Sequence, residues 1–351
     1  MNNRDISTFA GGGGTTSENL LHNIASISNL LKAWKEFKKG KRNKQGVSEF
    51  ELYLEDNIFK LHLDIISKKY KHDKYVDFYV SDPKRRHIHK ATVRDRVLHQ
   101  AIFRILYPVF DKHFIYHSYS SRKARGTHLG VERSYVACRK VSNNWKKKIY
   151  VLKCDVRKFF DSIDHSILQN LIERKVTCPD TMELLDLLLQ SFEKSKGVGL
   201  PLGNVTSQLF ANIYLNELDQ FMKHELKVQY YFRYCDDFII IHENKEFLLN
   251  LIEKIRKFLD NQLKLKLHPN KVEIRPMRQG IDFLGYVMLP NMIVLRTGTK
   301  KRIIKKIQTA KKKLETSTIS ELTFKSILTS YLGLLSHCRN RKLENYIKTF
   351  L

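Results

Sequence analysis

The stretch Tyr230-Tyr-Phe-Arg-Tyr-Cys-Asp-Asp-Phe-Ile-Ile-Ile241 decides the fold. Two apolar arms, residues 230–234 and 238–241, flank Cys235-Asp236-Asp237, a pattern typical of a β-hairpin. Adjacent carboxylates in an apolar hairpin repel each other and resist removal from water. A divalent cation relieves both costs, and an all-oxygen ligand set favours Mg²⁺. Alone, however, an Asp-Asp turn is more often a plain solvated turn.

A third carboxylate follows a second apolar strand. Ile149-Tyr-Val-Leu152 is a short apolar run bounded by polar residues, and Asp155 lies at its end. If this strand is a neighbour of the hairpin, three carboxylates meet at one edge of a sheet. That arrangement can hold two Mg²⁺ ions about 4 Å apart, which suits in-line phosphoryl transfer.

The remaining chain alternates helical and strand patterns. A capping box, Thr15-x-x-Glu18, precedes a helical stripe over residues 20–37. Alternation predicts a strand at 75–80, and Thr92 begins another helical stripe. Further helices are expected near residues 165–175, 181–193, 206–226 and 246–263, with a strand near 272–276 and an apolar stretch at 281–289. The tail predicts a basic amphipathic helix from about 296 to 314 and an apolar helix ending near 338.

Charge and composition narrow the function. The 351 residues hold 63 Lys and Arg against 36 Asp and Glu, a formal charge of +27, which favours a nucleic-acid partner. No apolar run approaches the ~18 residues that span a bilayer, so no membrane partner is expected. The five cysteines are scattered without a Cys-x-x-Cys pair, which argues against a disulfide scaffold and fits a cytoplasmic protein.

Several motifs resemble those of reverse transcriptases. Lys153-Cys-Asp155-x-x-x-Phe-Phe160 and Tyr234-Cys-Asp-Asp237 look like motifs A and C of that family. The motif B resemblance lies in Gly199-Leu-Pro-Leu-Gly203-Asn-Val-Thr-Ser207-Gln208, and the fingers motifs resemble Pro83-Lys84-Arg-Arg86 and Thr92-Val-Arg94-Asp-Arg96. Gly280-Ile-Asp-Phe283-Leu-Gly285-Tyr286 looks like the primer-grip turn. These motifs stand in the family's order over about residues 30–340.

The resemblance implies an α+β, right-hand polymerase with fingers, palm and a short helical thumb. Residues 1–29 would be a lead-in with the start of a helix, 30–145 the fingers, 146–290 the palm with the catalytic carboxylates, and 291–351 the basic helical thumb. The palm would be an antiparallel sheet backed by helices.

The family's metal ligands correspond to Asp155 and Asp236, with Asp237 as a weaker third carboxylate. These residues would hold two Mg²⁺ ions, with Mn²⁺ as a substitute. Phe160 occupies the position where a bulky ring excludes a ribose 2′-OH, which implies deoxynucleotide substrates.

Other positions would bind the incoming dNTP and the template–primer. The fingers cations Lys84 and Arg86 match residues that hold the triphosphate. Leu202 and Gly203 of motif B lie near the nucleotide, and Lys271 matches a basic residue near the departing pyrophosphate. The template RNA and the RNA/DNA duplex would contact Arg94, Phe283, Gly285, Lys301, Lys305 and Lys312.

Motif B points to a subtype. Most of the family has Gln-Gly-x-x-x-Ser-Pro, whereas this chain has an apolar Leu202 and ends the motif with Gln208. This variant is similar to that of diversity-generating retroelement reverse transcriptases, which copy RNA with errors at adenine and use a small basic accessory protein. A retron or phage-defence reverse transcriptase is the alternative. A non-catalytic RNA-binding protein on a polymerase scaffold is the remote one.

Overall fold

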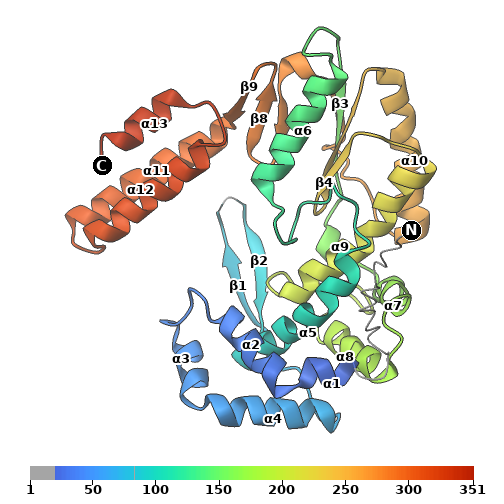
Figure 1. Cartoon of the computed structure of the whole chain (residues 1–351), viewed down its shortest axis with the longest axis vertical. Helices are drawn as coiled ribbons and strands as arrows, with labels where there is room; N and C mark the ends of the chain where they lie inside the picture. Colours follow the sequence, from blue (N-terminus) through green and yellow to red (C-terminus); the bar gives the residue numbers. More distant parts are fainter. Residues whose placement is uncertain (1–19, 83) are drawn as a thin grey trace, which may run out of the picture. The chain divides into compact units, whose positions relative to one another are not determined.

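The computed structural model describes residues 20–82 and 84–351 (Figure 1). The chain divides into two compact units, one of Met1–His113 with Phe160–Tyr214, the other of Phe114–Phe159 with Leu215–Leu351. The expected capping box at Thr15 and Glu18 lies outside the described residues. Within the described ranges, no helix is long and apolar enough to cross a membrane. The boundaries predicted for fingers, palm and thumb stay predictions.

The first unit is mainly helical. The single helix expected over 20–37 is wrong, because Ser26 ends α1 (Leu20–Ala25) and its Oγ accepts a hydrogen bond from the Asn29 N–H at 3.2 Å, which caps α2 (Ile27–Phe37). The expected helix after Thr92 is confirmed as α5 (Val93–Asp111). The other helices of this unit are α3 (Gln45–Leu52), α4 (Leu54–Ile66), α7 (His165–Glu173), α8 (Pro179–Gln190) and the start of α9 (Val205–Gln220).

A two-stranded hairpin belongs to the same unit. Strand β1 (Val76–Val80), as predicted from its alternation, pairs with β2 (Arg86–Lys90) in antiparallel register. The N–H of His89 on β2 donates a hydrogen bond of 3.1 Å to the carbonyl of Leu202. The hairpin is therefore joined to the motif B segment through its backbone.

The second unit is built on a four-stranded antiparallel sheet. Its strand order is β4-β5-β3-β6, with β3 at Tyr150–Asp155, β4 at Tyr231–Tyr234, β5 at Asp237–His242 and β6 at Glu273–Pro276. The prediction that the 149–152 strand neighbours the hairpin is confirmed, since Leu152 pairs with Ile240 in the register of β3 and β5. The α+β class with an antiparallel sheet is confirmed as well.

Side chains of this sheet alternate between two buried faces. Val151, Ile239 and Ile241 join one hydrophobic core with residues of α6 (Thr127–Val141). The opposite face carries Leu152, Cys154, Phe238 and Ile240, all of which are fully buried. Helix α10 (Lys245–Leu263), predicted from residue 246, contacts β3, β5 and β6. Both faces are apolar, which surrounds the polar end of the strands with a low dielectric.

A three-stranded sheet and three helices complete the second unit. The sheet runs β7 (Ile281–Phe283), β8 (Tyr286–Leu289) and β9 (Met292–Leu295). The predicted tail helices are confirmed as α11 (Thr297–Glu315) and α12 (Glu321–Leu335), and α13 (Arg341–Lys348) follows them. Short helical turns lie at η2 (Phe159–Ser162), η3 (Phe221–Glu225) and η4 (Met277–Gln279), so the helix expected to reach 226 changes to a π-helical turn after Gln220.

Candidate active site

Three carboxylates lie at one end of the four-stranded sheet. Asp155, the last residue of β3, is directly opposite Asp237, the first residue of β5. Residues directly opposite in an antiparallel pair project from the same face, so the two side chains are cross-strand neighbours. Asp236 precedes Asp237 in the two-residue turn from β4. Like charges on directly opposite residues destabilise the pairing of the two strands, which marks this end of the sheet as functional.

The backbone around the carboxylates is fixed on both sides. Cys235 in the turn has a φ of 55°, a left-handed conformation that is uncommon for a residue with a Cβ. The Val156 N–H donates a hydrogen bond of 3.2 Å to the Asp236 carbonyl, which ties the turn to the end of β3. The Asp155 carbonyl accepts a hydrogen bond of 2.7 Å from the His268 N–H.

A buried ion pair supports the turn from the other face of the sheet. Arg233 of β4 and Asp219 of α9 are both fully buried, and the guanidinium donates hydrogen bonds of 2.7 and 2.6 Å to the two carboxylate oxygens. Arg233 also donates a bond of 3.2 Å to the carbonyl of Cys235. This pair was not predicted from the sequence, although an arginine inside the apolar arm 230–234 is a signal of a buried partner. Its Asp219 partner could not be identified from spacing.

Burial has the largest effect on the pKa values of Asp236 and Asp237 in the β4–β5 hairpin. Removal from water raises the pKa of Asp237 to about 7, although the nearby Lys153 cation opposes the shift. Burial, and then the Asp155 charge, raises the pKa of Asp236 above its usual range. Oδ1 of Asp237 is buried and has no hydrogen-bond partner among the described residues. The site therefore concentrates negative charge that the protein's own donors leave only partly compensated.

Lys271 provides the direct positive charge. Its Nζ lies 2.9 Å from both carboxylate oxygens of Asp155, in a bidentate ion pair. The antiparallel register of β3 with β6 pairs Lys153 with Glu273, and its continuation places Lys271 beside Asp155. Asp155 thus lies between a like charge on β5 and an opposite charge ahead of β6. The sequence analysis placed Lys271 near a departing pyrophosphate, and that role stays a prediction.

The donor set fits a hard divalent cation. The three carboxylates lie at one end of the sheet without a histidine among them, although their oxygens are not all within 4.8 Å of one another. Oxygen ligands are those that Mg²⁺ prefers. The unpartnered Oδ1 of Asp237 and the raised pKa values indicate carboxylates poised for a cation. The ammonium group of Lys271 stands where a cation would bind Asp155.

Apart from Lys271, the residues predicted to bind the nucleotide belong to the first unit. Phe160 is half-buried, and its carbonyl accepts a hydrogen bond of 2.8 Å from the Leu200 N–H at the start of motif B. Gly203 has a φ of 135°, and a Cβ there would lie 3.1 Å from the carbonyl oxygen of His89. Motif B thus requires glycine where it contacts β2. Lys84 and Arg86 are exposed on the hairpin, and Leu202 is half-buried.

Two residues predicted to contact template and primer have other partners. The Arg94 guanidinium lies 3.3 Å from Asp73 and 3.3 Å from Asp95, which neutralise it within its own unit. Phe283 is fully buried in the hydrophobic core. These surroundings favour structural roles for both side chains over the predicted contacts. Gly285 lies at the β7–β8 turn with a φ of 88°, directly after Leu284 at 52°.

The basic helix α11 has the predicted amphipathic arrangement. Ile303, Ile307 and Ala310 are buried in one hydrophobic core with Phe324 and Leu328 of α12. In contrast, the side chains predicted to contact template and primer are exposed: Lys301, Lys305 and Lys312.

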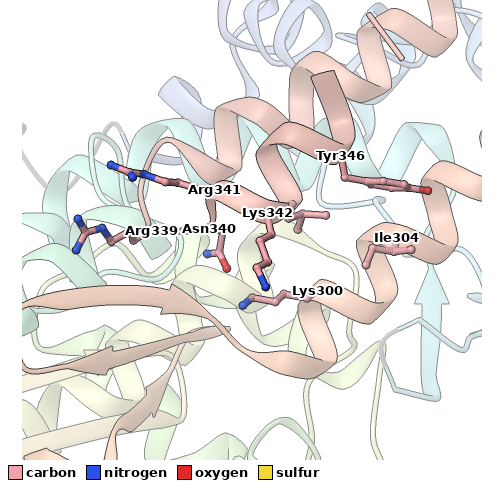
Figure 2. A pocket seen from close by; sticks show the side chains of 8 residues that line it. Lys300, Ile304, Arg339, Asn340, Arg341, Lys342 and Tyr346 are labelled. Atoms are coloured by element: carbon pink, nitrogen blue, oxygen red, sulfur yellow. The ribbon is translucent and has the colours of Figure 1, made fainter. Parts of the chain in front are cut away.

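A hollow of about 570 Å³ lies beside α11 and α13, and Figure 2 shows the side chains that line it. Lys300 and Ile304 come from α11, and Tyr346 comes from α13. Asn340, Leu343 and three more cations complete the lining, which contains no carboxylate; the cations are Arg339, Arg341 and Lys342. Cations around an aromatic ring are the side chains that bind single-stranded nucleic acids.

The amino-acid sequence of this chain is similar to those of known proteins. The chain is 25% identical over 250 residues to protein YkfC of Escherichia coli (strain K12), covering 60% of this chain and 64% of that protein. It is 25% identical over 280 residues to the group II intron-encoded protein LtrA of Lactococcus lactis subsp. cremoris, covering 60% of this chain and 45% of that protein. Each alignment spans less than two thirds of the relative's own length.

Among solved structures, apo telomerase from Candida tropicalis, truncated from its C-terminal domain, aligns with a TM-score of 0.46 and 15% identity. That alignment covers 68% of this chain and 59% of the telomerase chain. Residues 70–288, more than half of the chain, match the family described as "Reverse transcriptase (RNA-dependent DNA polymerase)". This region contains Asp155, Asp236 and Asp237. Because this match covers more than half of the chain, the chain belongs to the reverse transcriptase family.

Proposed function

We propose that this protein is an RNA-directed DNA polymerase, which adds deoxynucleotides to a primer 3′-OH on an RNA template. The observation that carries the proposal is the cross-strand pair of Asp155 and Asp237 beside Asp236, half-buried and with incomplete compensation of charge. A sheet does not gain stability from such a cluster, so a cation-dependent activity accounts for it. Membership of the reverse transcriptase family supports the same reaction.

The three carboxylates would hold two Mg²⁺ ions, or Mn²⁺ in their place. Bound there, the ions would stabilise charge on the attacking and leaving oxygens of phosphoryl transfer. The protein's contribution is to hold Asp155, Asp236 and Asp237 rigidly on sheet ends and a tight turn. The ammonium of Lys271 carries positive charge beside Asp155, from which it can interact with anionic phosphate groups.

Nucleotide recognition is assigned to residues of the first unit and stays part of the proposal. The exposed cations Lys84 and Arg86 would bind triphosphate oxygens, which a guanidinium does through paired hydrogen bonds. The half-buried ring of Phe160 would exclude a ribose 2′-OH by its volume. Leu202 and Gly203 would contact the incoming base pair, because their loop is fixed against β2 through the bond from His89.

The template–primer would be held by the basic helices. Exposed lysines on α11 and the basic hollow beside α13 (Figure 2) offer phosphate contacts. The apolar side of α11 packs into the hydrophobic core. Such contacts are independent of base sequence, which suits an enzyme that moves along its template.

A subtype is also proposed, that of a diversity-generating retroelement reverse transcriptase with a small basic accessory protein. Its support is Leu202, an apolar residue where most of the family has glutamine. A retron or phage-defence role is the alternative and would share the carboxylates. A cytoplasmic location stays a prediction.

The cation site should be visible in stability. The raised pKa of Asp237 means that its contribution to stability is lost as pH rises from about 4 through 7, because the folded state then holds an unfavourable charge. Asp237→Asn should therefore raise the metal-free Tm at about pH 8 by roughly 5 °C or more, with a smaller rise at about pH 5. Mg²⁺ should raise the Tm of the wild type by more than that of the variant, which keeps Asp155 and Asp236 and loses the third carboxylate.

The matched control is Asp260→Asn, which changes an exposed carboxylate on α10. Its Tm should stay near the wild-type value at either pH. A metal-free Asp237→Asn protein no more stable than the wild type at about pH 8 would contradict the buried-charge interpretation.

The carboxylates should be essential for synthesis. Asp155→Ala or Asp236→Ala should lower primer extension on an RNA template by at least about 10³-fold, because the ions that neutralise transition-state charge lose a ligand. RNA affinity should stay near wild type, and Asp260→Ala should extend primers normally. Extension by either active-site variant at the wild-type rate would refute the assignment. A wild-type protein that binds RNA and extends no primer would favour the non-catalytic alternative.

Errors in the cDNA test the subtype. Wild-type cDNA should carry an excess of substitutions opposite template adenines, and Leu202→Gln should reduce that excess several-fold by restoring a polar contact near the nucleotide. Leu202→Met, which keeps an apolar side chain of similar volume, is the control and should retain the excess. Sequencing of cDNA from a defined template measures both. Uniformly low error in the wild type would favour the retron or phage-defence alternative.

The α11 lysines should bind phosphates. Changing Lys301, Lys305 and Lys312 together to Gln should flatten the slope of log affinity against log salt by about two to three units, at roughly 0.7–0.9 per phosphate contact. Lys245, Lys254 and Lys257 on α10 are also exposed, so their triple Gln variant is a matched control. Equal slopes for both variants would show that the α11 lysines only face solvent.

A further inference from the structure

The β1–β2 hairpin carries three metal-ligating side chains on one face. Asp77 is directly opposite His89 in the antiparallel register, and Tyr79 is opposite His87. Alternation along each strand places Asp77, His87 and His89 on the same face, while Arg86, Ile88 and Lys90 project from the other. The motif pattern Asp-x-Tyr on one strand and His-x-His on the next thus becomes a cluster through strand pairing alone.

The side chains of this cluster approach closely. His89 Nδ1 lies 2.6 Å from Oδ1 of Asp77, and His87 Nε2 lies 3.5 Å from its Oδ2. One ligand atom from each residue can be chosen so that all three lie within 4.8 Å of one another. Among the described residues, this is the group of three or more His, Cys, Asp and Glu side chains that meets that condition.

The surroundings hold the two imidazoles in place and leave them accessible. The ring of Tyr79 stacks on His87 with centroids 4.6 Å apart and planes 9° apart, and Phe192 lies 4.5 Å from His89. The side chains of Asp77, His87 and His89 are 51%, 33% and 14% exposed, so an ion and its waters can enter from solvent. All of these residues belong to the first unit.

We propose that Asp77, His87 and His89 form a binding site for a transition-metal cation such as Zn²⁺. Two imidazoles and one carboxylate are ligands that Zn²⁺ accepts, whereas Mg²⁺ prefers oxygen alone. Three protein ligands leave a coordination position for water. In a tetrahedral site with metal–ligand bonds of about 2.0–2.1 Å, the ligand atoms lie about 3.3 Å from one another. Small rotations of the three side chains would bring their ligand atoms to that spacing.

The consequence is a cross-link between the two strands. A metal bound to Asp77 on β1 and to both histidines on β2 replaces the hydrogen bond between Asp77 and His89 with stronger bonds. The site shares no residue with the carboxylate cluster and differs from it in ligand chemistry, so the two can be tested separately. The proposal does not depend on the polymerase function.

Zinc affinity of the full-length protein tests the site. Metal-free protein is titrated with Zn²⁺ against a chromophoric chelator, with Mg²⁺ in excess so that the carboxylate cluster is occupied by its own ion. The wild type should bind one Zn²⁺ more tightly than His87→Gln or His89→Gln by at least about tenfold, in line with the loss of a ligand. Asp77→Asn, which keeps a hydrogen-bonding side chain, should also weaken binding. His22→Gln changes an exposed histidine on α1 and should bind as the wild type does.

A second measurement separates loss of the ligand from loss of the hairpin. Co²⁺ in place of Zn²⁺ should give visible absorption of a low-coordinate site with nitrogen ligands in the wild type, and that absorption should vanish in Asp77→Asn. Hydrogen exchange of residues 76–90 should slow on addition of Zn²⁺ in the wild type only. Equal Zn²⁺ affinity in the wild type and all three hairpin variants, or absence of stoichiometric binding, would overturn the proposal and leave Asp77 and His89 as a simple ion pair.

Discussion

The structure depends on one unfavourable juxtaposition, the cross-strand pair of Asp155 and Asp237. A sheet normally places opposite charges or apolar groups at such positions, because like charges across a pair destabilise it. Here the strands beneath are among the most buried segments of the chain, and the pair itself is half-buried, so water compensates the two charges only in part. Asp236 in the adjoining turn adds a third carboxylate. Other contacts within this unit hold the three carboxylates at this end of the sheet against their mutual repulsion.

Two cations on opposite sides of the sheet do this in different ways. Lys271 reaches Asp155 directly and lies at the rim, partly exposed, where it can exchange one partner for another. Arg233 is fully buried and pairs with Asp219, so it acts through the backbone by donating to the Cys235 carbonyl. Removing either member of such a buried pair leaves an uncompensated charge, which costs far more than a surface pair. The turn is therefore held by an interaction that does not compete with a cation for the catalytic carboxylates.

The sequence predicted those parts of the fold that local pattern controls. The hairpin at 230–241, the 149–152 strand beside it and the basic α11 follow from alternation and helical spacing, and the structure has them. Apolar residues also recur at helical spacing over residues 20–37, yet Ser26 divides this segment into two helices. A capping residue can interrupt a helix without changing the spacing of the apolar residues on either side. The carboxylate cluster was predictable only once two strands were assumed to be neighbours.

Side-chain partners that come from distant segments could not be predicted. Asp219 lies on a helix whose residue spacing gives no reason to pair it with Arg233. The pair becomes apparent only in the structure, where both side chains are fully buried. Arg94 was predicted to contact nucleic acid from the fingers-motif resemblance of residues 92–96, but Asp73 and Asp95 lie beside its guanidinium in the folded chain. The cluster of Asp77, His87 and His89 was likewise not predicted, because it forms only when the strand register places Asp77 opposite His89 and on the same face as His87.

Anomalous scattering of Mn²⁺ in crystals of the full chain tests directly whether Asp155, Asp236 and Asp237 form a divalent-cation site. We expect anomalous density in contact with carboxylate oxygens of Asp155 and Asp236, with the Lys271 ammonium shifted away from its bidentate contact. Crystals at saturating Mn²⁺ that show no anomalous density at these carboxylates, with Lys271 still paired to Asp155, would contradict this assignment.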